Sequence, residues 1–249
     1  MRYSLLGGGK RIRPVLCLAV GEALGRDPEE LLAAACSLEL VHTFSLVHDD
    51  LPALDDDDLR RGQPSAHVRF GEGVAILAGD ALLTEAFRLV LTYPTPDPAR
   101  ELAQATLGMI AGQYVDFTTD GGLDSVGLAE LHELKTGRLL RASVTCATAV
   151  AGVPSSERER WAAFGREVGL LFQIVDDILD ATGTADELGK TPGKDEAAGK
   201  VTYVSLHGLE RARELADEAR GRVNERLEEL PADTSVLAAI VAAIRERRA

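Results

Sequence analysis

The sequence predicts an all-α protein folded as one domain over residues 1–249. The first observation is the spacing of apolar residues, which follows the helical period through most of the 249 residues. The second is that no segment shows the alternation of apolar and polar residues expected of a half-buried strand. The third is size, because a chain of this length with 45% hydrophobic residues can bury a substantial core.

Composition and charge exclude several classes of protein. The formal net charge of −13 argues against binding to nucleic acid or to an anionic membrane surface. No stretch approaches the ~18 uninterrupted apolar residues of a membrane span, and the first residues lack the apolar core of a signal peptide. The three cysteines, Cys17, Cys36 and Cys146, are embedded in apolar segments. We therefore expect reduced thiols in a cytoplasmic protein.

The first helices begin at recognisable signals. Residues 7–10 (GGGK) form a glycine-rich turn, which is not a P-loop because Arg11 occupies the place of the Ser or Thr. Pro14 suits the first turn of a helix that continues to about Leu24. Residues 27–30 (DPEE) are typical of a helix start, with Asp as the N-cap and Pro at the first position.

The helix that starts there leads into an unusually acidic stretch, residues 46–62, LVHDDLPALDDDDLRRG, with six aspartates in ten positions. Pro52 should end or sharply kink the helix. Asp49 and Asp50 then lie at a helix C-terminus, where the macrodipole disfavours negative charge. Like charges about 4 Å apart repel by roughly 1 kcal/mol in water and roughly 4 kcal/mol at a partly buried site, so a cation should offset them. The alternative for such a run is a solvated acidic loop.

The second half continues as helices, over about 74–91, 97–116 and a longer segment ending near 151. A lysine, threonine and glycine at 135–137 interrupt this last helix. Glycine within a helix costs about 0.5–1 kcal/mol and favours a kink, and this one could direct Lys135 into a cavity. A helix opened by Ser155 carries the next acidic cluster, and two amphipathic helices, roughly 201–229 and 233–247, close the chain.

The second acidic cluster is FQIVDDILD at 172–180, which places Asp176, Asp177 and Asp180 inside an apolar helical pattern. Asp176 and Asp180 are four residues apart and project from one face. Because burying unpaired charge is costly, two such clusters indicate hard, oxygen-ligated cations. Mg²⁺ fits best, since it commonly takes one or two carboxylates and completes its shell with water and phosphates. The polar, glycine-rich residues 182–200 are interpreted as a lid that carries Lys190 and Lys200 over a bound anion.

Together these segments resemble the trans-prenyl diphosphate synthases, the polyprenyl synthetase family that includes the farnesyl and geranylgeranyl diphosphate synthases. The two aspartate-rich stretches look like that family's first and second motifs. GGGKRIRP at 7–14, GQYVD at 112–116, KTG at 135–137 and LGK at 188–190 follow its order, so the resemblance covers about residues 2–210. It implies an isoprenoid synthase-type helical bundle around a central cavity, and a homodimer. Members usually carry further helices before GGGKRIRP, which this domain is expected to lack.

The resemblance also implies a role for individual residues. Three Mg²⁺ ions, for which Mn²⁺ could substitute, would be held by Asp49, Asp50, Asp55, Asp176, Asp177 and Asp180. Isopentenyl diphosphate would be anchored by Lys10, Arg13, His42 and Arg61. The allylic partner (dimethylallyl, geranyl or farnesyl diphosphate) would be contacted by Arg60, Lys135, Thr136, Gln173, Lys190 and Lys200. The catalytic set comprises Asp49, Asp50, Asp55, Arg60, Lys135, Asp176 and Lys190, which stabilise the charge that grows on the leaving diphosphate.

Product length would depend on residues just before the first aspartates. A bulky aromatic at Phe44, with Ser45 beside it, resembles the cavity floor of the short-chain synthases, so we expect a C15 product, with C20 as the alternative. The pair Gln113 and Asp116, three apart on one helix, would lie near the reacting carbons, or would form a structural hydrogen bond. A terpene cyclase would lack the set Lys10, Arg13 and His42. A noncatalytic subunit would have lost one aspartate cluster, and a calcium-binding loop would need a different ligand spacing.

Overall fold

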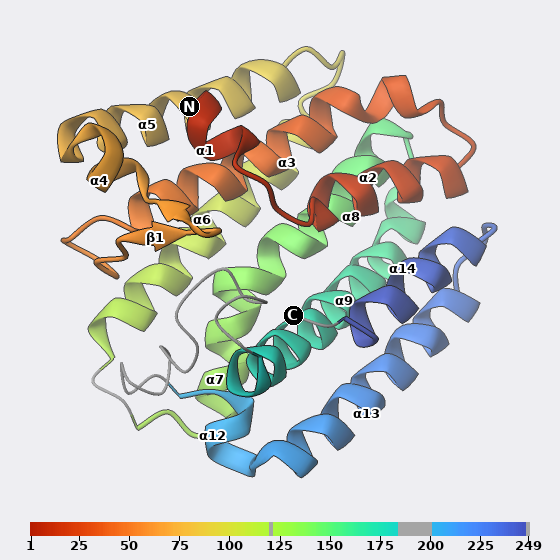
Figure 1. Cartoon of the computed structure of the whole chain (residues 1–249). Coiled ribbons are helices and arrows are strands. Elements are labelled where there is room, and N and C mark those ends of the chain that lie inside the picture. The colour runs from red at the N-terminus through yellow and green to blue at the C-terminus, as the bar shows by residue number, and fades with distance from the viewer. Residues whose placement is uncertain (120–121, 184–200, 248–249) are drawn as a thin grey trace.

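The computed structural model describes residues 1–119, 122–183 and 201–247, and within them the fold is all-α, as predicted (Figure 1). The helices of the first half are α1 (Arg2–Leu6), α2 (Ile12–Ala23), α3 (Pro28–Asp49), α4 (Ala66–Phe70), α5 (Glu72–Val90) and α6 (Asp97–Thr118). Those of the second half are α7 (Ser125–His132), the π-helix η1 (Glu133–Gly137), α8 (Arg138–Val150), α9 (Ser155–Thr182), α12 (Tyr203–His207), α13 (Leu209–Glu228) and α14 (Ser235–Arg245).

Helix α8 lies at the centre of the bundle, with α2, α3, α6 and α9 packed around it (Figure 1). Ten of its residues are buried, so it has almost no solvent-facing side. On the outside, α5 covers α3, and α13 and α14 cover α9. The core is built from large side chains with no exposed surface, among them Trp161, Phe164, Leu16, Leu31, Leu38 and Leu82.

The long helix α3 begins and ends where the sequence predicts. Asp27 accepts from Glu29 N at 2.9 Å, Glu30 accepts from Asp27 N, and the helix ends at Asp49, three residues before Pro52. It is also the one described helix that is long and apolar enough to cross a membrane by length and composition. Because 61% of its most apolar window is buried inside the bundle, it has the character of a core helix of a folded domain.

Two details differ from the sequence prediction. The loop after α3 contains a two-residue antiparallel ladder, β1 (Leu59–Arg60) with β2 (Gln63–Pro64), too short to produce any alternation in sequence. The helix expected over 201–229 is divided at Gly208, whose φ of 79° a helix cannot accommodate, so α12 and α13 are separate. The proposed lid, with Lys190 and Lys200, lies outside the described residues apart from its first two residues, 182–183.

Candidate active site

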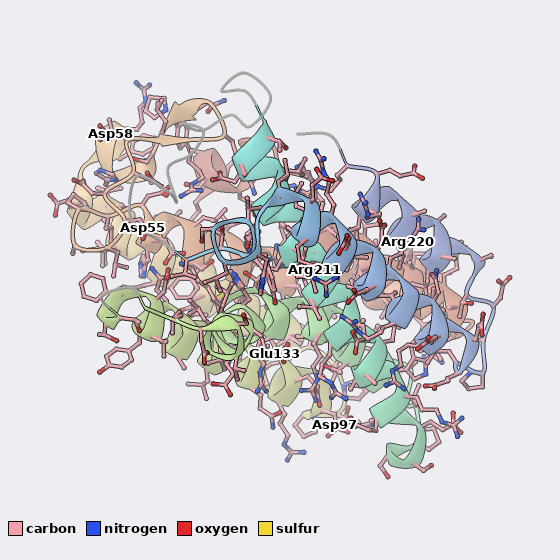
Figure 2. All side chains as sticks on the ribbon, turned by 90° about the horizontal axis from the view of Figure 1, so that it is seen from below. Asp55, Asp58, Asp97, Glu133, Arg211 and Arg220 are labelled. Atoms are coloured by element: carbon pink, nitrogen blue, oxygen red, sulfur yellow. The ribbon has the colours of Figure 1, made fainter. Side chains whose placement is uncertain are left out.

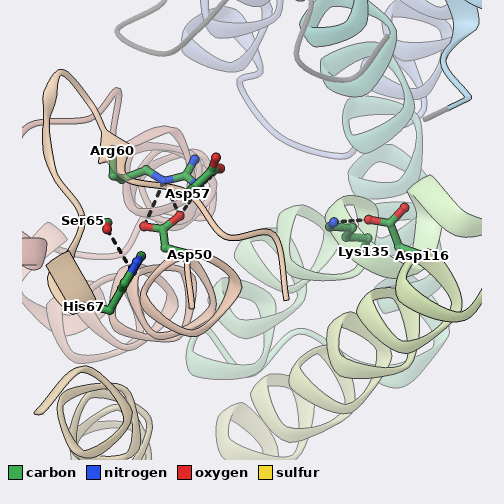
Figure 3. Close-up of polar contacts among 7 residues, drawn as sticks. All are labelled: Asp50, Asp57, Arg60, Ser65, His67, Asp116 and Lys135. Atoms are coloured by element: carbon green, nitrogen blue, oxygen red, sulfur yellow. Dashed lines mark hydrogen bonds and ion pairs between the residues drawn. The ribbon is translucent and has the colours of Figure 1, made fainter. Parts of the chain in front are cut away.

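The first acidic cluster surrounds an arginine. Asp50 is buried and accepts a hydrogen bond of 2.9 Å from Arg60 Nε and a further one from Arg60 Nη2 (Figure 3). The same Nη2 lies 3.2 Å from a carboxylate oxygen of Asp57. Asp55 and Asp58 lie on this loop, on the opposite side of the view from Arg220 of α13 (Figure 2). The cation expected from the charge of the run is therefore supplied, for Asp50, by an arginine ten residues later.

Asp49 has a different environment. It lines a cavity of about 510 Å³, and burial raises its pKa to about 6. This value already includes the neighbouring carboxylates of Asp55 and Asp50, which also raise the pKa, and the charges of Lys135 and Arg60, which lower it. A carboxylate with this pKa binds a proton readily near neutral pH, and a divalent cation would compete for the same oxygen atoms.

A second cavity, of about 360 Å³, collects basic side chains. Burial lowers the pKa of Arg13 to about 10, and it also lowers that of Arg61. The pKa of His42 lies well below its ordinary value because of burial and the surrounding arginines, which leaves the ring neutral at pH 7. Such a group of cations is an anion site. Its lining includes these predicted residues: Lys10, Arg13, His42, Arg60, Arg61, Thr136, Gln173 and Asp176.

The glycine-rich turn at the mouth of this anion cavity is held by two arginines. Arg11 donates to the carbonyl of Gly8 at 2.7 Å, and Arg61 donates to the same carbonyl. Both have left-handed backbones, with φ of 53° and 54°, at a cost of about 1–2 kcal/mol each. Arg11 also pairs with Glu39, a buried carboxylate of α3. Gly9 has a φ of 113°, a backbone conformation that strongly favours glycine, and a Cβ there would also lie 2.6 Å from the Arg61 guanidinium.

The 510 Å³ cavity is mainly apolar, and we call it the tail cavity. Phe44 and Ser45 of α3 line one wall, and Phe44 is 8% exposed. The opposite wall is α6, including Met109, Ile110, Gln113, Tyr114 and Phe117. Arg13, His42, Leu46 and Thr136 line both this cavity and the anion cavity, so the two spaces adjoin.

Lys135 enters the tail cavity from the π-helix η1, the interruption predicted from the sequence. Its Nζ lies 2.5 Å from Asp116 Oδ2 (Figure 3). The backbone of η1 rests directly on α6, where a Cβ at Gly112 would come within 2.5 Å of Lys135 N. A π-helix at a functional position is a common arrangement, and this one fixes the origin of the lysine side chain.

The second acidic cluster is held in the fold most firmly at Asp177. Asp177 is buried and accepts from Gln173 Nε2 and from Tyr203 N, both at 2.8 Å. His132 Nε2 lies 3.6 Å from the same carboxylate, and its ring stacks on Tyr203. Asp177 thus fixes the start of α12 against α9. Asp176 faces the anion cavity and a third cavity of about 190 Å³, which Asp177 also lines.

Asp176 pairs with Arg247 at 3.1 Å, and this guanidinium also lies 4.7 Å above the Phe172 ring. Thr136 lines all three cavities, so Asp49 and Asp176 open onto connected or adjoining spaces. Asp50, Asp55 and Asp180 line none of these three within the described chain.

The carboxylates of the two acidic clusters are the candidate ligands for Mg²⁺. Among the described residues, no group of three or more His, Cys, Asp or Glu side chains forms a metal site by itself. The chemistry of the donors nevertheless fits, because Mg²⁺ is commonly held by one or two carboxylates together with substrate phosphates. Asp49 lines the tail cavity, and Asp176 lines the anion cavity while it pairs with Arg247. Asp50 is engaged by Arg60, and Asp177, which lines the third cavity, is engaged by Gln173 and Tyr203.

Several residues of the site were not identified from the sequence: Arg11, Glu39, His132, Tyr203 and Arg247. Glu39 did carry a signal, since it is a single charge within the apolar run LELV, and a charge in such a position is usually paired. Each of the other four has a side-chain or ring partner that is distant along the chain, and no local pattern indicates it.

The all-α bundle with an anion-binding cavity adjoining an apolar one defines an isoprenoid synthase-type protein. A family model, Polyprenyl synthetase, matches residues 1–244, and the chain belongs to this family. It is 49% identical over 242 residues to "Heterodimeric geranylgeranyl pyrophosphate synthase large subunit 1, chloroplastic" of Arabidopsis thaliana, covering 91% of this chain and 65% of that protein. It is 48% identical over 240 residues to "Geranylgeranyl pyrophosphate synthase, chloroplastic" of Capsicum annuum, covering 92% and 65%.

Solved structures share the fold. A polyprenyl synthase from Caulobacter crescentus, complexed with calcium and isoprenyl diphosphate, superposes with a TM-score of 0.90 at 26% identity, covering 98% of this chain and 87% of that one. A geranyltransferase from Helicobacter pylori, complexed with magnesium and isoprenyl diphosphate, gives 0.83 at 35% identity, covering 98% and 84%.

These comparisons correct two expectations. The cytoplasmic location is wrong by this comparison, because these relatives are named as chloroplastic proteins. The three thiols are free, with Cys17 and Cys146 buried and Cys36 exposed, and free thiols indicate a reducing compartment but do not distinguish one from another. The preference for a C15 product is also less well supported than the C20 alternative, because the relatives are named as geranylgeranyl pyrophosphate synthases.

Proposed function

We propose that the protein is a prenyltransferase that joins isopentenyl diphosphate to an allylic diphosphate in a 1′–4 condensation, with a C20 product. The observation that carries the proposal is the adjoining pair of cavities. A cation-lined space meets an apolar one at Arg13, His42 and Thr136, with Asp49 opening onto the apolar space and Asp176 onto the cation-lined one. A substrate with a diphosphate head and a hydrocarbon tail requires such a division.

The allylic substrate loses diphosphate to give a carbocation, which the double bond of isopentenyl diphosphate attacks. Lys135 and Arg60 stabilise the negative charge that grows on the leaving group. Lys10, Arg13, His42 and Arg61 anchor isopentenyl diphosphate, with neutral His42 as a hydrogen-bond donor. The departing diphosphate takes the final proton, so no side-chain nucleophile is required.

Mg²⁺ bound by Asp49 and Asp176, with contributions from Asp50, Asp55, Asp177 and Asp180, would neutralise the diphosphate as the carbon–oxygen bond breaks. Mn²⁺ is expected to substitute. The number of ions, three by the resemblance, is open to measurement by titration calorimetry with an unreactive diphosphate.

The protein is also proposed to be a homodimer. Support comes from a row of largely exposed apolar residues on α6, at intervals of three or four residues: Leu107 and, where α6 also borders the tail cavity, Ile110, Tyr114 and Phe117. A contiguous apolar face of this kind is typical of a subunit interface. Light scattering of the purified protein tests this, and a monomer at all concentrations would contradict it.

The experiment for the activity is a product assay with Mg²⁺, radiolabelled isopentenyl diphosphate and dimethylallyl, geranyl or farnesyl diphosphate in turn. We expect C20 product, with a loss of at least roughly 10²-fold in rate for Asp49→Asn. Asp58→Asn is the matched control, because Asp58 is exposed in the same acidic run. Absence of any prenyl product would refute the function, and a C15 product would refute the assigned length.

A further inference from the structure

His48 lines the tail cavity between the proposed floor residue and the first aspartate. Its ring meets Phe44 edge-on, with centroids 5.0 Å apart and planes at 74°. On the other side, Nε2 lies 3.0 Å from the carbonyl oxygen of Ile76 and 3.9 Å from Asp80 Oδ1, both on α5. The ring is therefore placed between α5 and the cavity.

Glycine at position 79 makes this placement possible. A Cβ at Gly79 would lie 2.1 Å from His48 Nε2 and 2.3 Å from Cδ2. Gly79 is buried, and it lies on the same face of α5 as Ile76, three residues earlier. The ring thus occupies the space that any other side chain at position 79 would fill.

We propose that His48, seated on Gly79, is a specificity-determining residue that sets the width of the tail cavity beside Phe44 and thereby limits product length. The proposal rests on the proposed function. Phe44 is the proposed floor of the cavity, and His48 would be a residue of its wall. The position of His48 is set by α5, although α5 contributes no side chain of its own to the lining of this cavity.

The direction of the effect follows from the geometry. With alanine at position 79, His48 has to retreat by about 1.3 Å, from 2.1 Å to the 3.4 Å at which ordinary contact begins. The α5 backbone blocks one side, so the ring moves toward Phe44 and the cavity. Removing the ring by His48→Ala has the opposite effect and widens the cavity. A difference of one methylene in an apolar pocket discriminates by roughly 10–200-fold.

The test measures the ratio of C15 to C20 product and the free energy of unfolding. Gly79→Ala is expected to raise the ratio about tenfold, and His48→Ala to lower it with longer products appearing. In the double variant, Gly79→Ala should have no effect on the ratio, because there is no ring left to displace. Gly73→Ala is the matched control, since a Cβ there meets nothing within 4 Å on the same helix, and it should leave the ratio unchanged.

An unchanged ratio in active Gly79→Ala would overturn the proposal, as would an equal shift in the double variant. Where Gly79→Ala fails to fold, His48→Ala alone decides: a ratio equal to that of the unaltered protein overturns the role of the ring. If the unaltered protein makes no prenyl product, the proposed function itself fails, which is a separate outcome.

Discussion

Substitution of Gly112 by alanine should move Lys135 without changing its side chain, so this variant tests whether catalysis depends on the position of the lysine. Gly112 is buried on α6, and a Cβ there would lie 2.5 Å from Lys135 N, 2.7 Å from Lys135 Cα and 2.9 Å from the Leu134 carbonyl carbon. These neighbours are backbone atoms, which cannot rotate away. To reach 3.4 Å, η1 must move from α6 by about 0.9 Å.

Two opposing effects determine the expected change in the free energy of unfolding, and one effect determines the expected change in rate. Overpacking of this kind costs about 1–3 kcal/mol, while replacing glycine by alanine within a helix contributes about 0.5–1 kcal/mol. We therefore expect a loss of up to about 2.5 kcal/mol in the free energy of unfolding. A displacement of about 1 Å at a charge-stabilising group costs roughly 10²-fold in rate, and the effect on kcat should exceed the effect on stability.

The assay is steady-state prenyl transfer with urea unfolding measured on the same preparations. Gly221→Ala on α13 is the control, because a Cβ there meets nothing within 4 Å; it should keep full activity. Gly112→Ala with unchanged kcat and unchanged stability would refute the reasoning. A loss of stability with normal kcat would show that the catalytic rate does not depend on the exact position of η1 and Lys135.

Three further predictions concern charge and volume. Glu39→Gln removes the buried partner of Arg11 and should lower the free energy of unfolding by about 1–3 kcal/mol. Addition of inorganic pyrophosphate should raise the Tm of this variant more than it raises the Tm of the unaltered protein. The raised pKa of Asp49, about 6, gives metal-free protein a contribution to stability that is present below the ordinary pKa and is lost as pH rises through about 6. Mg²⁺ affinity, measured by calorimetry, should fall up to about tenfold per pH unit below that value. Phe44→Ala should shift products toward longer chains in the chromatographic assay, and an unchanged profile would exclude Phe44 as the floor.

The local signals were sufficient to predict the helices, because each depends on neighbours in sequence. The Asp27 capping box, the stop before Pro52 and the interruption at 135–137 all appear in the structure as expected. The boundaries that could not be predicted are those set by contacts between distant segments. The π-helical form of η1, for example, is accompanied by a close approach to Gly112 on α6, and this contact is invisible in the local pattern.

The site was predictable to a similar degree. The sequence identified residues able to bind a cation or an anion, but it did not identify the groups of the same chain that pair with these residues. Asp50 is paired with Arg60, Asp176 with Arg247 and Asp177 with the backbone of Tyr203. The repulsion within an acidic run indicated that cations were needed, without indicating that arginines of the same chain supply part of the charge.

The net charge of −13 shows why the total is a poor guide to such a site. Lys10, Arg11, Arg13, Arg60 and Arg61 converge on one cavity, together with a single buried carboxylate, Glu39, on the side of Arg11. At a Debye length of about 8 Å in physiological salt, exposed charges elsewhere on the surface are largely screened from this cavity. Burial of these arginines lowers the pKa of Arg13 and Arg61, which means that their charged forms are under-solvated. A diphosphate that enters the cavity replaces this lost solvation, and the site therefore attracts an anion although the protein as a whole repels it.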